Sequence, residues 1–135
     1  MSSLKQLKLA EKVAGRSRIV IGELQSLVKD IDRCERTMTA LKTELAAVNS
    51  KYQGPRNTRE DIAYLTVLLD CAKKKLAWEK TIASLQKRTP DILSKMSSLI
   101  NDPQNPPPEE TRAQMLASLQ AVQSAMERLQ QVKIE

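Results

Sequence analysis

The chain has 135 residues, of which 22 are lysine or arginine and 16 are aspartate or glutamate, so its net charge is +6. It has no histidine, which removes the commonest general base and metal ligand. Two cysteines cannot form the disulfide framework of a small secreted domain. The scarcity of glycine and the abundance of good helix formers predict an all-α chain with an aliphatic core.

The first expected helix covers residues 3–52, and one apolar seam runs along most of it. Its members alternate in steps of four and three: Val20, Leu24, Leu27, Ile31, Cys34, Met38, Leu41, Leu45, Val48 and Tyr52. This spacing averages 3.5 residues, which is typical of a supercoiled helix pair. Extended backwards, the same register passes through Ser17, its weak position, and reaches Val13 and Ala10.

A second apolar series widens only the first half of this helix. Its members recur every seven residues: Leu7, Ala14, Ile21 and Val28. Polar residues occupy the next three places of the series. We therefore expect a third helix to pack against the first half alone, and residues 36–75 to form an arm of two helices.

Gly54 and Pro55 end the first helix and begin a short turn. Either Asn57 or Thr58 caps the next helix, because an acidic residue follows each of them by three positions. So short a connection predicts an antiparallel hairpin.

The second helix is expected over residues 58–100. Its seam toward the first helix consists of Tyr64, Leu68, Cys71, Trp78, Ile82 and Leu85, with Lys75 as an interruption. Two interpretations of Pro90 remain open. The helix is either kinked there, or it is broken and restarts with Thr89 as its N-cap.

This second helix also carries an apolar stripe that its pairing with the first helix does not use. The stripe consists of Ile62, Leu65, Leu69, Ala72 and Leu76. A helix with two apolar faces contacts neighbours on both, so we expect it to be the central helix of the fold. Either a binding partner occupies the stripe, or the last helix covers it.

Residues 101–108 form a proline-rich connector that cannot be helical in its middle. The last helix is expected over residues 109–133, and its seam consists of Met115, Leu119, Val122, Met126 and Leu129. The predicted fold is a single elongated helical hairpin or coiled coil. Its third helix completes a three-helix bundle at the end that holds both termini.

Basic residues gather in two clusters that we expect to form one surface. The first consists of Lys5, Lys8, Lys12, Arg16 and Arg18. The second supplies five candidate contacts to an anionic partner: Lys73, Lys74, Lys80, Lys87 and Arg88. Such a surface suits nucleic acid, a microtubule or acidic lipid. A solvated face without a partner is the alternative.

No catalytic, cofactor or metal site is expected, since the three glycines are scattered and the cysteines lack partners for zinc or a catalytic triad. Both cysteines occupy apolar helical positions, which predicts buried free thiols and a reducing compartment. The N-terminus lacks the apolar core of a signal peptide, although its basic pattern also fits a mitochondrial presequence. No apolar run is long enough to span a bilayer.

These patterns predict a non-enzymatic coiled-coil adaptor or structural subunit of a multiprotein assembly, in the cytoplasm or nucleus. It would bind a helical partner chain, or a second copy of itself, through the stripe. The alternative function is that of a basic helical module on an anionic surface. A small-molecule substrate is not expected.

Overall fold

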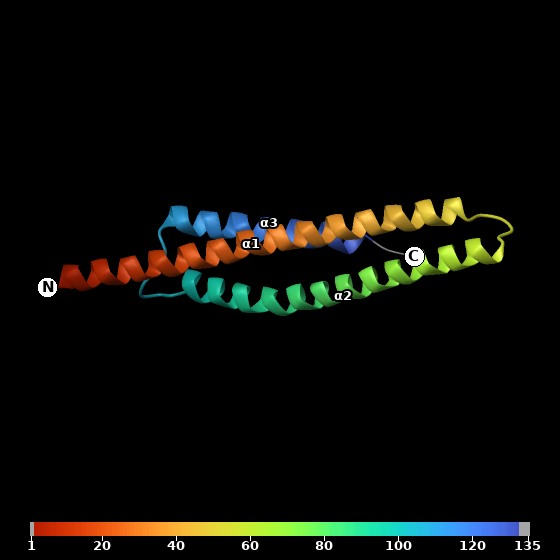
Figure 1. Cartoon of the computed structure of the whole chain (residues 1–135). Coiled ribbons are helices and arrows are strands. Elements are labelled where there is room, and N and C mark those ends of the chain that lie inside the picture. Colours follow the sequence, from red (N-terminus) through yellow and green to blue (C-terminus); the bar gives the residue numbers. More distant parts are fainter. Residues whose placement is uncertain (1, 133–135) are drawn as a thin grey trace.

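The computed structural model describes residues 2–132, which form three long helices without a β-strand. Helix α1 covers Ser2–Lys51, α2 covers Thr58–Ile100 and α3 covers Glu109–Gln131. The prediction of an elongated all-α fold is confirmed (Figure 1). Residue 133, the expected end of the last helix, lies outside the described residues.

Helices α1 and α2 run antiparallel, and their ion pairs give the register. The Lys95 ammonium lies 3.5 Å from the Glu23 carboxylate, and that of Lys74 lies 3.1 Å from Glu44. As the residue number falls along α2, the number of its partner on α1 therefore rises. At about 1.5 Å per residue, α1 makes a rod of roughly 75 Å, and α2 follows most of it.

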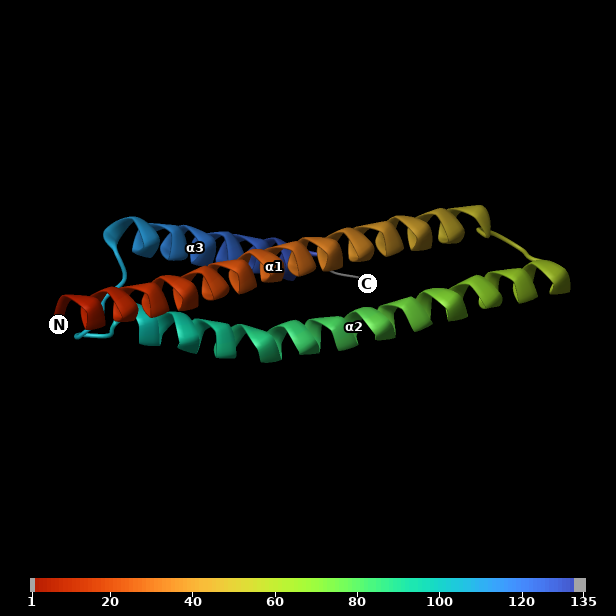
Figure 2. The same ribbon diagram turned by 60° about the vertical axis from the view of Figure 1, so that its left-hand side comes forward.

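Helices α2 and α3 both pack on α1, which runs between them in the view of Figure 2. Helix α3 runs parallel to α1, and Arg128 near its end pairs with Asp32 of α1 at 3.1 Å. The expectation that α2 is the central helix is therefore wrong. The two apolar faces of α2 indicated that α2 has a second neighbour. Within this chain, however, it is α1 that packs against two helices.

The larger hydrophobic core lies where all three helices run side by side, a region we call the bundle half. Its buried members are Val20, Leu24, Leu27, Ile31, Cys34, Leu85, Ile92, Met96, Met115, Val122, Ala125 and Leu129. Leu24, Leu27 and Ile31 have no exposed surface. They are covered so completely because α2 and α3 both pack on this part of α1.

Beyond the last turn of α3 the α1–α2 pair continues over residues 36–75, which we call the arm, and Val132, the residue after α3, packs on the core at its inner end. Its core is small and consists of the buried Met38, Leu41 and Cys71. Val67, which the predicted seam omits, also packs on this core, whereas Lys75 is exposed. Farther out, Val48 is only half-buried, because no third helix reaches that level.

The turn at the tip of the arm resolves one open alternative. Gly54 has a φ of +85°, the left-handed conformation that glycine adopts without a steric penalty after a helix. Asn57 is the N-cap of α2, and its side-chain oxygen accepts a hydrogen bond of 2.9 Å from the Glu60 amide. This bond satisfies one of the free amides of the first turn.

Helix α2 continues through Pro90 without a break. Proline has no amide hydrogen, so the carbonyl four residues earlier loses its usual helical partner. The hydroxyl of Thr89, the residue directly before Pro90, donates a hydrogen bond of 2.7 Å to the Leu85 carbonyl one turn earlier in α2. Thr89 therefore lies inside α2 and does not cap a new helix.

Two polar side chains lie on the buried seams. The indole Nε1 of Trp78 donates a hydrogen bond of 3.0 Å to the Cys34 carbonyl, which links α2 to α1. The Ser17 hydroxyl is fully buried and has no hydrogen-bond partner among residues 2–132. A buried hydroxyl without a partner is destabilising.

Candidate interaction surface

The apolar stripe of α2 faces solvent along its whole length. Ile62 and Leu65 are each 62% exposed, Leu69 is 58% exposed and Leu76 is 54% exposed. Ala72 is exposed between them. These side chains lie about half a helical turn away from the α2 residues that pack on α1, at 100° per residue.

Helix α3 does not cover the stripe. It packs mainly on α1, and its buried side chains share the core of the bundle half with those of α2 and do not reach the outer face of α2. It also ends at Gln131. Arg128, in its last turn, pairs with Asp32 and Glu35, which lie just before the arm begins. The interpretation in which the last helix swings over the stripe is therefore wrong.

The stripe differs from the other exposed apolar side chains of the molecule. Leu116 on α3 and Ile19 on α1 are each exposed singly, and Leu4, Leu7 and Leu9 belong to the end of α1, where residues 3–12 are all exposed. Single exposed leucines are ordinary on a protein surface. A continuous row that spans roughly 20 Å at 1.5 Å per residue is typical of an interface.

Two of the five basic residues expected to contact an anionic partner are bound within the chain. Lys74 pairs with Glu44 and with Asp70, each at 3.1 Å, and Arg88 pairs with Asp30 at 2.8 Å. Hydrogen bonds to Asp70 and Glu44 raise the pKa of Lys74 above its ordinary value. These side chains hold α2 in register with α1.

The other three, Lys73, Lys80 and Lys87, are exposed and take no part in the ion pairs among the described residues. Lys73 and Lys74 lie at the level of Glu44, in the arm. The cluster over residues 5–18 lies at the opposite end of the rod (Figure 1). The expectation that the two clusters form one basic surface is therefore wrong.

A set of polar and aromatic contacts that the sequence pattern did not reveal closes the tip. The Arg56 guanidinium lies 4.4 Å from the Tyr64 ring centroid, pairs with Asp61 at 2.8 Å, and donates a hydrogen bond to the Tyr52 carbonyl. The Tyr64 hydroxyl donates a hydrogen bond of 2.7 Å to the Asn49 side chain. We call this set the tip clasp. It fixes the start of α2 next to the stripe.

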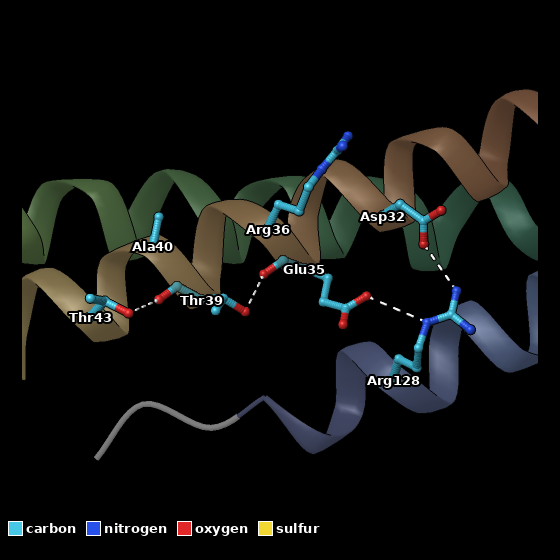
Figure 3. A pocket seen from close by; sticks show the side chains of 7 residues that line it. All are labelled: Asp32, Glu35, Arg36, Thr39, Ala40, Thr43 and Arg128. Carbon is cyan, nitrogen blue, oxygen red and sulfur yellow. Dashed lines mark hydrogen bonds and ion pairs between the residues drawn. The ribbon is translucent and has the colours of Figure 1, made fainter.

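A shallow groove opens on α1 where α3 ends (Figure 3). It is lined by Asp32, Glu35, Arg36, Thr39, Ala40, Thr43 and Arg128. Arg128 binds both carboxylates, and the two threonine hydroxyls donate hydrogen bonds to carbonyls one turn earlier in α1. Of the charged side chains that line the groove, only Arg36 is without an ion pair among the described residues, so the groove offers little to a ligand.

The cysteine thiols are both free and buried, as predicted. Burial raises the pKa of Cys34, partly offset by a hydrogen bond with Trp78, and burial raises the pKa of Cys71. Both therefore remain protonated and weakly nucleophilic at neutral pH. Within residues 2–132, no group of three or more histidine, cysteine or acidic side chains is placed to hold a metal ion.

None of the helices in the described part of the chain contains an apolar stretch that could cross a bilayer. No protein-family model matches the chain, and neither a curated protein nor a solved structure matches it.

Proposed function

We propose that this chain is a non-enzymatic helical adaptor or structural subunit of a multiprotein assembly. It binds another helical chain through the stripe on α2. The observation that carries this proposal is the exposure of four large aliphatic side chains, between 54% and 62%, in one row on the face opposite α1. Such a row is costly in water unless a partner covers it.

Burying the stripe offsets a large part of the free-energy cost of association. Because each side chain is already partly covered, burying the rest contributes roughly 1–2 kcal/mol per residue. Four such residues offset much of the loss of translational and rotational freedom, about 4–15 kcal/mol. Contacts along the edges of the stripe supply the remainder.

The stripe is also held in one conformation before a partner arrives. The tip clasp fixes the start of α2 beside Ile62, and Lys74 ties the middle of α2 to Glu44. A preformed surface loses less conformational entropy on binding.

Two buried free thiols suit a protein of a reducing compartment, and we place the assembly in the cytoplasm or nucleus.

Replacing Leu65 and Leu69 with serine tests the proposal. Both side chains point away from α1, so the double variant should keep the helicity and melting temperature of the parent. It should fail to join the assembly that the parent enters when both are purified from the native cell. Mass spectrometry of the two preparations identifies the lost partner.

A matched control replaces Leu7 and Leu116 with serine. These leucines are also 49–62% exposed but lie away from the stripe, so the control should retain every partner. If the parent chain alone is a stable monomer by light scattering, and the stripe variant still co-purifies with each partner, the proposal is wrong.

A second candidate function, binding to an anionic surface, is favoured by the free end of α1. Lys5, Lys8 and Lys12 are exposed there, beyond the part of α1 that α2 and α3 cover. Such binding should weaken steeply as salt rises, whereas apolar helix docking should barely respond. A titration of duplex DNA, microtubules and anionic vesicles at two ionic strengths separates the two functions.

A further inference from the structure

One edge of the stripe carries a row of lysines. Lys73, Lys80 and Lys87 are seven residues apart, so their side chains lie along the same side of α2. Lys73 follows Leu69 by four residues and Lys80 follows Leu76 by four, and residues at that spacing are neighbours on a helix surface. The row therefore flanks the stripe directly.

The opposite edge holds little free negative charge to balance the row. The residues at equivalent seven-residue steps there are Asp61, Leu68, Lys75 and Ile82. Asp61 already pairs with Arg56 at 2.8 Å. Glu79, three residues after Leu76, is exposed and takes no part in the ion pairs among the described residues. Apart from this one acid, the flanks of the stripe are positive or apolar where a partner helix could contact them.

This charge pattern disfavours a second copy of the chain as the occupant. In a parallel pair, Lys75 of one copy would face Lys80 of the other across the seam. In an antiparallel pair centred on Leu69, Lys80 would lie near Arg59 of the other copy, although Glu79 would lie level with that arginine. The parallel arrangement thus sets like charges against each other. In neither arrangement does a second copy offer a row of acids to Lys73, Lys80 and Lys87.

We infer that the occupant of the stripe is an amphipathic helix of a different chain, with aspartate or glutamate at seven-residue intervals facing Lys73, Lys80 and Lys87. This inference rests on the proposed function and specifies the partner. Apolar side chains of that helix cover Leu65 and Leu69, and its acidic flank pairs with the lysine row.

The lysine row and the stripe are offset along α2, and this offset predicts where the acidic residues of the partner helix lie. The last leucine of the stripe is Leu76, whereas the last lysine of the row is Lys87. The two residues are eleven positions apart, which corresponds to roughly 16 Å at 1.5 Å per residue. The acidic flank of the partner helix therefore extends beyond its apolar residues, toward the bundle half.

Two synthetic helical peptides test the inference on the full-length protein. Both have four heptads and the same leucine face, but one carries glutamate and the other lysine at the flanking positions. Titration by fluorescence anisotropy should show the glutamate peptide binding about tenfold more tightly at low salt, as expected for three exposed ion pairs. The difference should shrink as salt rises.

Charge reversal on the protein is the second part of the experiment. Changing Lys73, Lys80 and Lys87 to glutamate should invert the preference between the two peptides. These lysines are exposed and lie outside the ion pairs, so helicity should be unchanged. Changing Lys5, Lys8 and Lys12 to glutamate alters the net charge equally and should leave the preference intact.

The outcomes separate this inference from the proposed function. If both peptides bind equally and the Leu65→Ser, Leu69→Ser variant loses both, the acidic partner is wrong while the docking function stands. If the stripe variant binds both peptides like the parent, the docking site itself is wrong. A dimer of the chain alone that the stripe variant abolishes would overturn the different-chain occupant. If the protein bound duplex DNA more tightly than either peptide, and the stripe variant retained that binding, the inference that the partner is a helix would be wrong.

Discussion

The bundle half and the outer part of the arm share one seam on α1 but bury it to different depths. Leu24 and Leu27 have no exposed surface, whereas Leu45 and Val48 on the same seam are only half-buried. Met38 and Leu41, beside which Val132 packs, are still 1% and 3% exposed. The seam spacing is unchanged along the helix, and burial falls only farther out, past the end of α3, where α2 alone covers the seam. Periodicity thus determines which face is buried, and the number of covering helices determines how deeply.

The same difference sets apart the roles of the two regions. The bundle half has a buried core drawn from three helices, which supplies most of the stabilising contacts. The arm has three buried core residues, yet it bears the exposed stripe. We therefore expect the arm to open locally at a lower free energy than the bundle half.

The largest expected effect comes from a charge placed in the arm core. Leu41→Asp puts a carboxylate at a position that is 3% exposed, which should cost more than about 4 kcal/mol. The arm should lose its helicity while the bundle half stays folded, so circular dichroism should show a partial loss and a remaining melting transition. Lys42→Asp, at the next and exposed position, should melt like the parent. Identical curves for Leu41→Asp and the parent would contradict the hairpin.

The rates at which the two buried thiols react compare how readily the arm and the bundle half open. Cys71 belongs to the arm core and Cys34 to the bundle core, and both are 3% exposed. Because a buried thiol reacts only after local opening, iodoacetamide should modify Cys71 at least about tenfold faster than Cys34. Rates in urea, where both are accessible, correct for intrinsic reactivity. Equal native rates would mean that arm and bundle open together.

A smaller effect is expected where the two cores meet. Trp78 packs against both clusters and donates a hydrogen bond to the Cys34 carbonyl. Trp78→Phe keeps most of the ring but removes the donor, and should lower the free energy of unfolding by about 1 kcal/mol. Urea denaturation measures the change. Tyr52→Phe, whose hydroxyl contributes no hydrogen bond to the core, is the control and should unfold like the parent.

The smallest expected effect has the opposite sign. Ser17 is fully buried in the bundle half with its hydroxyl unpaired, so Ser17→Ala should stabilise the chain by roughly 1 kcal/mol. Part of any gain reflects the higher helix propensity of alanine. Ser26→Ala, at an exposed site of the same helix, measures that part alone. A Ser17→Ala gain no larger than the Ser26→Ala gain would show that the hydroxyl carries no penalty.

The seam and the stripe could be predicted from the sequence because both are repeated patterns on one helix. Steps of four and three residues identified the buried run through Leu41, and a second set of such steps identified Leu65 and Leu69. The uncovered second half of α1 followed from the end of its wider face after Val28. Local periodicity was enough for each of these features.

Contacts between helices could not be predicted in the same way, since they depend on register and on which helix is shared. Lys74 and Arg88 were expected to face solvent, but both reach acids on α1 across the pair. A second apolar face on α2 did not reveal that α1 lies between the others. The tip clasp combines Arg56 with Tyr64, residues that no repeat connects.

The tip clasp also bears on the order in which the chain folds. Its Tyr64–Asn49 bond closes 15 residues, Trp78–Cys34 closes 44 and Arg128–Asp32 closes 96. Because closing a longer loop costs more entropy, the hairpin should zip from its tip and α3 should dock last. The arm would thus form first although it is the less stable region, and pulse-labelling hydrogen exchange during refolding would reveal that order. The residues of the arm, which open most readily in the folded protein, would then be the ones that set the register of α1 and α2 during folding.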